Sequence, residues 1–564
     1  MKYKKKELFT FFFSYQRKYL HIAVWTAILL LFNVLLQLPM PLVTRYLIDN
    51  IIPAKDFKSL NTLCIALLVI ILIRIFSNYF LQYLIARYKT RVRFDMERDL
   101  YLHIQELPLS FFNEKPTGYI LSRIAEISSV DSILADTFLY ILQDIITIVV
   151  GAVLILKMHV PLGLISLFLL PFFVLSIKAF HKKIKGINKE LREESAQYTG
   201  KLEKNLTAIE KIKSAVIEER QGKQVTNKLS RVIALVFKSE MISAFASSVS
   251  AFIGMIAPFV VLWYGVSEII RGRLTLGTFV AINSFLSYLY SPARRLTDTG
   301  YSISRAMAGL ERIYELFNNS REASGGETIQ RIDSIEFRDV EFTYNGNDWV
   351  LRHLNLNIAK GEKIALVGES GQGKSTIVRM ILKFFEPTRG SIFISGMDSK
   401  TIEIKSLRRK IAYIPQRQYI IEDELEEQIK DIKALNLLKK FKFEKVLQEV
   451  NNGIKQKEFS GGEIQKIEMM ESILKNADVL IIDEGTSNID FNAEKIIMEE
   501  ILSKYQDKII IFIAHRLTSI TGFKRIIVLD NGSIAEEGEH DALTVKKGKY
   551  FYLWGKQEQE PSSA

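Results

Sequence analysis

The chain has 564 residues, 48% of them hydrophobic and 24% charged, with a net charge of +12. This length is too great for one compact domain, so we expect at least two. The single cysteine, Cys64, excludes a disulfide framework, a cysteine-based zinc site and a redox pair. Much of the basic charge flanks apolar runs, which favours a lipid bilayer over nucleic acid as the partner.

The first 300 residues contain apolar stretches of the length that crosses a membrane. A spanning helix needs about 20 mostly apolar residues. Six stretches fit, and they predict an all-α, six-helix transmembrane domain: Leu20–Ile48, Leu60–Leu84, Phe138–Leu156, Leu162–Phe180, Ile242–Trp263 and Leu276–Tyr290.

Two of the segments between these stretches, Ala86–Asp136 and His181–Glu240, are long, polar and rich in Lys and Arg. Their apolar residues recur at helical spacing, so we expect the helices to continue through them. The positive-inside rule places both segments and the N-terminus in the cytoplasm. We therefore predict a multi-pass protein of the cell (inner or plasma) membrane, with the C-terminal half in the cytoplasm.

Two charged residues stand inside predicted spans, Arg74 in the second and Asp144 in the third. A charge within a membrane is a candidate functional residue. Both can also be structural, because long helices leave the lipid and Arg can extend its head group to the interface. The sequence leaves their role open.

A polar segment rich in Ser and Gly, Asn318–Thr328, separates the apolar half from a half in which strand-like and helix-like runs alternate. This alternation predicts an α/β domain. We expect a transmembrane domain over 1–320, a linker over 321–330 and an α/β domain over 331–564.

The segment Gly368–Ser375 matches the phosphate-binding P-loop pattern GxxxxGK[ST]. It follows the strand-like run Lys363–Val367 and precedes a helix-like run, as this motif requires. Lys374 can reach the β- and γ-phosphates, and the Ser375 hydroxyl can bind Mg²⁺. The predicted ATP contacts here are Gly368, Glu369, Ser370, Gly371, Gln372, Gly373, Lys374, Ser375 and Thr376.

Downstream, Asp478–Glu484 reads as an apolar strand that ends in two acids, the Walker B pattern. The run is apolar enough for a parallel strand buried on both faces. We expect Asp483 to hold the Mg²⁺ shell and Glu484 to polarise the attacking water. Between the two motifs, Ser460 and Glu463 have capping-box spacing, and Gly461 and Gly462 let the backbone approach an anion.

The order of these motifs resembles the ATPases of ABC (ATP-binding cassette) transporters. The resemblance implies that Ser460, Gly461, Gly462 and Glu463 of one subunit close on the ATP held by the P-loop of a partner. It assigns adenine stacking to Tyr344, Mg²⁺ sensing and catalysis to Gln416, and γ-phosphate contact to His515. Ser487–Asp490 resembles the D-loop.

The first half resembles the membrane domain of exporters in the same family, with Phe111–Asn113 and Glu203–Leu206 in its two cytoplasmic loops. The sequence departs from the family at Phe459, where leucine is usual, and in the shortened segment before it. Glu463, Glu468 and Glu471 also replace residues that are more usual in the family. These departures lie near the surface expected to couple the domains, and the residues assigned to ATP are all present.

The resemblance implies a half-transporter that exports its substrate by alternating access, driven by ATP and Mg²⁺. Because the chain keeps Lys374, Glu484, His515 and an intact signature, we expect a homodimer with two equivalent sites. We predict a peptide or other natural product as cargo, and a lipid or mixed drugs as the alternative. No peptidase-like segment precedes the first span, so we do not expect a leader-cleaving exporter. An ATP-gated channel is the rival of another class, which Glu484 and His515 argue against.

Overall fold

The computed structural model describes residues 3–323, 325–416, 460–483, 501–514 and 517–559, together with isolated positions between 421 and 439 and residue 499. The chain forms two compact units. The first comprises residues 1–105 and 117–319, and the second comprises residues 106–116 and 320–564.

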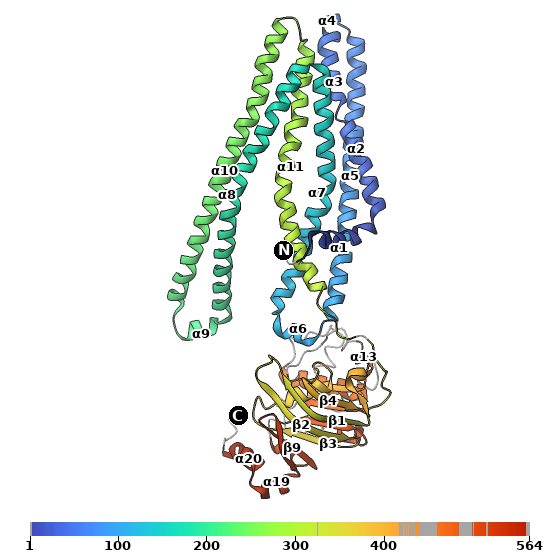
Figure 1. The fold of residues 1–564 in the computed structure, drawn as a ribbon, viewed down its shortest axis with the longest axis vertical. Helices are drawn as coiled ribbons and strands as arrows, with labels where there is room; N and C mark the ends of the chain where they lie inside the picture. The colour runs from blue at the N-terminus through green and yellow to red at the C-terminus, as the bar shows by residue number, and fades with distance from the viewer. Residues whose placement is uncertain are drawn as a thin grey trace. The chain divides into compact units, whose positions relative to one another are not determined.

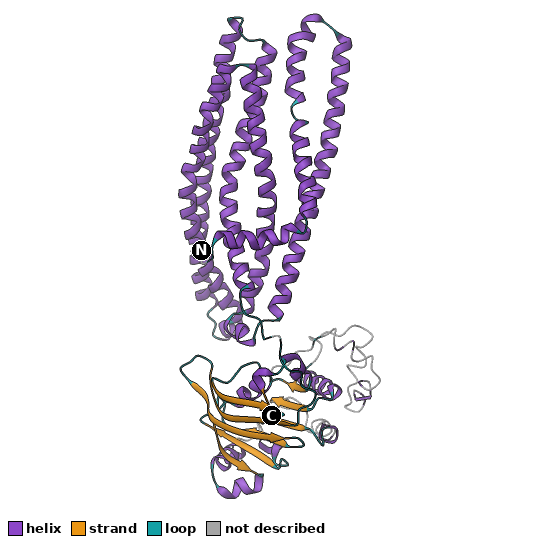
Figure 2. Cartoon of the chain, turned by 45° about the vertical axis from the view of Figure 1, so that its right-hand side comes forward, coloured by secondary structure: helices purple, strands orange, loops and turns teal. Residues whose placement is uncertain are grey.

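The first unit is built of helices (Figures 1 and 2). Their bounds are α1 Lys5–Arg17, α2 Leu20–Leu35, α3 Pro39–Tyr46, a π-helical turn Leu47–Ile51, α4 Ile52–Ala54, α5 Phe57–Gln105, α7 Thr117–Met158, α8 Val160–Thr207, α9 Ile209–Ser214, α10 Glu218–Ile270 and α11 Leu276–Phe317. The first predicted span is thus divided between α2 and α3, and Pro39 begins α3, a position where its missing N–H costs nothing.

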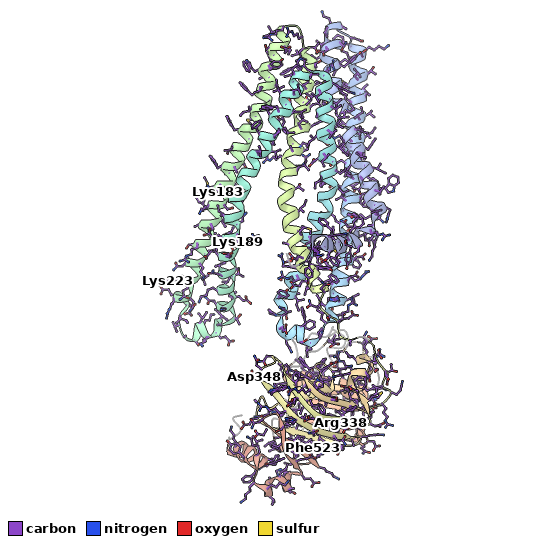
Figure 3. The ribbon with its side chains drawn as sticks, viewed as in Figure 1. Lys183, Lys189, Lys223, Arg338, Asp348 and Phe523 are labelled. Atoms are coloured by element: carbon purple, nitrogen blue, oxygen red, sulfur yellow. The ribbon has the colours of Figure 1, made fainter. Side chains whose placement is uncertain are left out.

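The long helices continue through the polar segments, as the sequence predicted. The helix α10 has 53 residues and α5 has 49. At 1.5 Å per residue these helices are about 75–80 Å long, more than twice the hydrocarbon thickness of a bilayer. Figure 3 labels Lys183 and Lys189 on α8 and Lys223 on α10, in the polar parts of these helices.

By length and apolarity, four helical segments in the described part of the chain can cross a membrane: Leu20–Ala54, Phe57–Gln105, Leu139–Met158 and Glu218–Ile270. The fourth predicted span lies in α8, whose apolar part is shorter, Val160–Leu175. The sixth lies in α11, where Thr278, Asn283 and Ser287 interrupt the apolar run. Five of the six predicted stretches are therefore continuously helical, and the first is interrupted at residues 36–38.

Polar contacts join the helices inside this unit. The helices α8 and α10 run side by side (Figure 1), and the Ser239 hydroxyl donates to Asn188 Oδ1 at 3.1 Å. Between α7 and α11, the Asp144 carboxylate accepts from Arg295 Nη2 at 2.5 Å and from its Nε at 3.0 Å. Asp144 is 2% exposed, so this pair compensates a buried charge.

The second unit contains two sheets in its described residues. The strands β1 Ser334–Thr343, β2 Trp349–Ala359, β4 Arg389–Ile394 and β5 Met397–Asp398 form an antiparallel sheet in the order β2-β1-β4-β5. The other sheet has the order β10-β9-β3-β8-β7-β6, with bounds β3 Lys363–Val367, β6 Ile411–Ile414, β7 Val479–Asp483, β8 Ile509–Ile513, β9 Arg525–Asp530 and β10 Ser533–Gly538.

Helices and short turns complete this unit: α6 Leu109–Glu114, α12 Lys374–Ile381, α13 Ile404–Arg409, α17 Gly461–Lys475, α19 His540–Lys546, α20 Lys549–Gln559 and the 3₁₀ turns Ser399–Thr401 and Leu517–Ile520. The segment that contains α6 is held by the chain that follows α11. The Glu322 N–H donates to the Glu106 carbonyl at 2.7 Å, and Arg321 pairs with the Glu106 carboxylate at 2.8 Å.

The parallel strands fix where functional side chains gather. Every residue of β7 and β8 is buried, which confirms the prediction of a strand covered on both faces. The strands β3, β6, β7, β8 and β9 are mutually parallel. Their carboxyl ends therefore lie along one edge of the sheet, where the P-loop begins after β3 and the Walker B strand β7 ends in Asp483.

Candidate functional site

The loop between β3 and α12 contains two glycines at which a side chain would not fit. Gly373 has φ +95°, and a Cβ there would lie 2.6 Å from Leu351 Cδ2. At Gly368, with φ +155°, a Cβ would lie 2.6 Å from the Leu529 carbonyl oxygen. Both positions therefore require glycine, because a side chain would collide with the packed strands behind the loop.

Lys374 is the first residue of α12 and is 7% exposed. Its Nζ donates to the carbonyls of Gly368 at 2.6 Å and Glu369 at 2.9 Å, so the side chain folds back across the loop. The helix N-terminus adds a partial positive charge at the same place. Lysine, backbone N–H groups and helix end together form an anion site suited to phosphates.

The next residue of this loop meets the Walker B strand. The Ser375 hydroxyl lies 3.4 Å from Asp483 Oδ1, and Asp483, the last residue of β7, is 3% exposed. A hydroxyl and a carboxylate beside a phosphate site are ligands that Mg²⁺ prefers. In the described residues no group of three or more His, Cys, Asp or Glu gathers as a metal site, so the Mg²⁺ prediction depends on these two oxygen donors.

Sequence reasoning missed Tyr413, on the neighbouring strand β6. Its hydroxyl hydrogen-bonds the Asp483 carboxylate. Burial raises the pKa of Tyr413 strongly, and the negative charge of Asp483 raises it further, so the hydroxyl stays protonated and donates to Asp483. Glu468, 8% exposed on α17, contributes in the same direction. The sequence signal that could have found this residue is a single tyrosine in the otherwise apolar strand β6.

Tyr344 follows β1 and lies beside the first turn of α12. Its hydroxyl is 3.1 Å from Thr376 Oγ1 and accepts from Arg379 Nη1 at 3.3 Å. Its ring packs edge-on against Phe342 and Phe385, yet the residue remains 46% exposed. An aromatic ring that is fixed at its edges can offer a face to a flat base next to the phosphate loop.

The signature segment begins α17. The Ser460 hydroxyl accepts from the Glu463 N–H at 3.4 Å, and the Ser460 N–H donates to Glu463 Oε2 at 2.7 Å. This reciprocal pair is a capping box, as the spacing predicted. Gly461 and Gly462 form the first turn of this helix, behind the exposed Ser460.

Some of the remaining predicted site residues lie in the described part of the chain, and the others lie outside it. Gln416 is exposed and lies two residues beyond β6, at the same sheet edge as Asp483. Glu369, Ser370, Gly371 and Gln372 form the P-loop itself. Glu484, His515, Phe459 and Ser487–Asp490 lie outside the described residues.

Comparison with known proteins agrees with this geometry. Residues 24–293 match the family described as the ABC transporter transmembrane region, and residues 351–487 match the ABC transporter family. The chain is 31% identical over 532 residues to the lactococcin-G-processing and transport ATP-binding protein of Lactococcus lactis subsp. lactis, covering 90% of this chain and 74% of the relative. The chain belongs to the ABC transporter family.

Other similar proteins support the same assignment for this ABC transporter. An ATP-dependent lipid A-core flippase of Syntrophus aciditrophicus (strain SB) is 29% identical, with 90% of this chain and 87% of the relative covered. A putative multidrug export ATP-binding/permease protein of Bacillus subtilis (strain 168) is 28% identical, with 92% and 94% covered.

The fold is that of a bacterial Atm1-family ABC exporter solved with ATP bound. The TM-score is 0.81 at 22% identity, with 96% of this chain and 99% of the other covered. The predicted fold class is thereby confirmed. The protein is a membrane-embedded ABC exporter, a helical transmembrane domain followed by an ATP-binding domain whose ATPase activity is coupled to transport.

Proposed function

We propose that two copies of this ABC exporter form a homodimer that exports a peptide or other natural product by alternating access. The observation that carries the proposal is the arrangement around Lys374 and Asp483, a P-loop whose cation and Mg²⁺-type donors lie together. The signature Ser460–Glu463 opens a capped helix whose exposed first residue can receive the phosphates of a nucleotide held by the other copy.

The chain's own residues divide the work at each ATP site. Lys374 and the P-loop N–H groups hold the phosphates, and the ring of Tyr344 supports the base. Ser375 and Asp483, with Gln416, would hold Mg²⁺, which supplies charge neutralisation at the phosphates when bound. Tyr413 orients the Asp483 carboxylate through its hydrogen bond. Glu484 polarises water for attack and His515 contacts the terminal phosphate.

The proposal also includes the domain limits and the membrane orientation. The transmembrane domain covers 1–320, the linker 321–330 and the ATPase domain 331–564. The Lys- and Arg-rich parts of α5, α8 and α10 favour a cytoplasmic position for these helix ends and for the ATPase domain. The membrane is the cell (inner or plasma) membrane. A tag near Ala54 should be accessible only from outside, and a tag in His181–Glu240 only from the cytoplasm.

The cargo assignment follows the relatives. One relative at 31% identity is named for lactococcin-G processing and transport, which favours a peptide. The second candidate is a lipid or drug cargo, which the names of the flippase and multidrug relatives favour.

The test is to purify the chain alone in lipid nanodiscs. It should be a dimer, hydrolyse ATP with Mg²⁺, and trap two nucleotides per dimer when Glu484→Gln blocks turnover. A monomer without ATPase activity that a second gene product rescues would overturn the homodimer. An ATP-gated conductance without directional transport would favour a channel.

A further inference from the structure

A polar pocket lies between α2, α5 and α7, inside the first unit. Its volume is about 310 Å³. All three helices contain segments apolar enough to cross a membrane. The polar side chains that line the pocket are Asn33, Gln37, Arg74, Asn78, Gln82 and Gln143.

Helical spacing directs these groups to one place. On α5, Arg74, Asn78 and Gln82 follow one another at intervals of four residues, and the apolar Ile71 and Ile75 share their face. Asn33 lies on α2, and Gln37 lies in the turn that follows this helix. A polar line on an apolar helix, with further carboxamides facing the same cavity, is costly in lipid unless it serves a function.

The existing hydrogen bonds position part of this lining. The Asn33 Nδ2 donates to Ser77 Oγ at 2.9 Å, which joins α2 to α5. The Gln82 Nε2 donates to the Tyr140 hydroxyl at 3.4 Å, which joins α5 to α7. On α11, the Tyr288 hydroxyl donates to the Gln37 carbonyl at 2.7 Å. The pocket is therefore held by contacts from four helices.

The charge of the pocket is unbalanced. Among the described residues that line it there is one cation, Arg74, and no acid. The acid next in the chain to Gln143 is Asp144, and Arg295 already holds its carboxylate with contacts at 2.5 Å and 3.0 Å. No hydrogen bond or ion pair of the Arg74 guanidinium occurs among the described residues. A guanidinium in an apolar helix gains most from an anion that accepts two hydrogen bonds.

We propose that this pocket binds an anionic group of the cargo, with Arg74 pairing the anion and the carboxamides of Asn78, Gln82 and Gln143 bonding the polar groups beside it. The inference rests on the proposed function and specifies the cargo. A volume of about 310 Å³ is at the lower end for ligand pockets, so it takes one head group rather than a whole molecule. A peptide supplies such a group as a carboxylate flanked by amides, and a lipid supplies it as a phosphate.

The test uses the full chain in nanodiscs and three probes. These are the tripeptide acetyl-Leu-Leu-Gly with a free carboxylate, the same tripeptide as its carboxamide, and dodecyl phosphate. Binding is measured as the shift of the unfolding temperature against probe concentration, without nucleotide. The variants are Arg74→Gln, Arg74→Lys and Gln143→Leu. Arg87→Gln, an exposed arginine on α5 that does not line the pocket, is the matched control.

The free carboxylate should bind the unmodified chain more tightly than its carboxamide. Arg74→Gln should weaken carboxylate binding about tenfold or more. Arg74→Lys should weaken it less, because the charge stays and only the paired hydrogen bonds are lost, and Arg87→Gln should change it about threefold at most. Gln143→Leu should weaken both peptides, since it removes a hydrogen-bonding group and leaves the cation.

Two results overturn the inference: no shift with either anionic probe, or binding of both anionic probes that is equal before and after Arg74→Gln. A response to Arg74→Gln confined to dodecyl phosphate keeps the anion site and replaces the peptide source by a lipid. Since binding is measured without nucleotide, it decides this inference even if the chain hydrolyses no ATP, a result that would contradict only the proposed function.

Discussion

The two units of the molecule place their apolar side chains in opposite ways. In the second unit, the strands β7 and β8 are buried along their whole length. In the first, α5 leaves Ile65 63% and Phe76 72% exposed within its apolar part. Both arrangements keep apolar atoms out of water, since lipid solvates the outside of the first unit. The difference is a consequence of the surrounding solvent.

Polar groups differ between the units in the same sense. At the ATP site, Asp483 ends strand β7 and is fixed by the sheet register, and Lys374 begins α12 and is fixed by the carbonyls of the P-loop. In the first unit, the buried Asp144 depends on a single partner helix through Arg295. The polar groups of the candidate ATP site therefore gather at one sheet edge, whereas the polar contacts of the first unit are distributed over several helices.

The largest effect is expected from a substitution in the ATP site. Lys374→Ala removes the cation that lies across the P-loop, and ATP turnover should fall by about 10²–10³-fold, the usual cost of losing one preorganised charge stabiliser. ATPase assays of the purified dimer measure this. Lys360→Ala, which removes an exposed lysine before β3, should stay within about twofold. Equal activity of the two variants would refute the P-loop assignment.

In the first unit, the largest loss of stability is expected at the buried ion pair of Asp144 and Arg295. Arg295→Met leaves the Asp144 carboxylate buried without its partner and should destabilise the first unit by about 3 kcal/mol. Equilibrium unfolding in mixed micelles measures it, with Arg294→Met as the neighbouring control. The double variant Asp144→Leu with Arg295→Met should recover much of the loss. A double variant as unstable as Arg295→Met alone would show that the pair is not the cause.

The sequence predicted the features that depend on local spacing and missed those that depend on contacts between distant residues. The P-loop, the capping box at Ser460 and the helical course of the long polar segments were predictable, because each depends on local spacing. Tyr413 was not, since it meets Asp483 only through the pairing of β6 with β7. The pairing of Arg295 with Asp144 was missed for the same reason, because the two residues are 151 positions apart in the chain.

A smaller effect is expected from a substitution that tests the contact between the paired strands β6 and β7. Tyr413→Phe removes the hydroxyl that orients Asp483, and turnover should fall about tenfold or slightly more, the lower end of the loss expected for one hydrogen bond to a charged group. The Mg²⁺ concentration for half-maximal activity should rise. Tyr552→Phe, which changes an exposed tyrosine on α20, should leave both unchanged. If the two variants behave alike, Tyr413 has no positioning role.

The smallest effect separates folding from chemistry at the signature. Ser460→Ala removes the cap of α17 and should lower stability by about 1 kcal/mol. Ser460→Asn keeps a capping side chain and should restore stability, yet ATP turnover should stay low in both because the serine hydroxyl is absent. Thermal unfolding and ATPase activity are compared for the two. Normal turnover in Ser460→Asn would reduce Ser460 to a structural cap.

The most direct test of the account asks whether each ATP site is shared by two chains. Chains with Lys374→Ala and chains with Ser460→Arg carry different tags and are purified as mixed dimers, with Glu484→Gln in both to prevent turnover. A mixed dimer has one site with an intact lysine and an intact facing signature, whereas each parent dimer has none. We expect one trapped nucleotide per mixed dimer and none in either parent. Mixed dimers that trap no nucleotide, or parent dimers that trap two, would contradict the shared site.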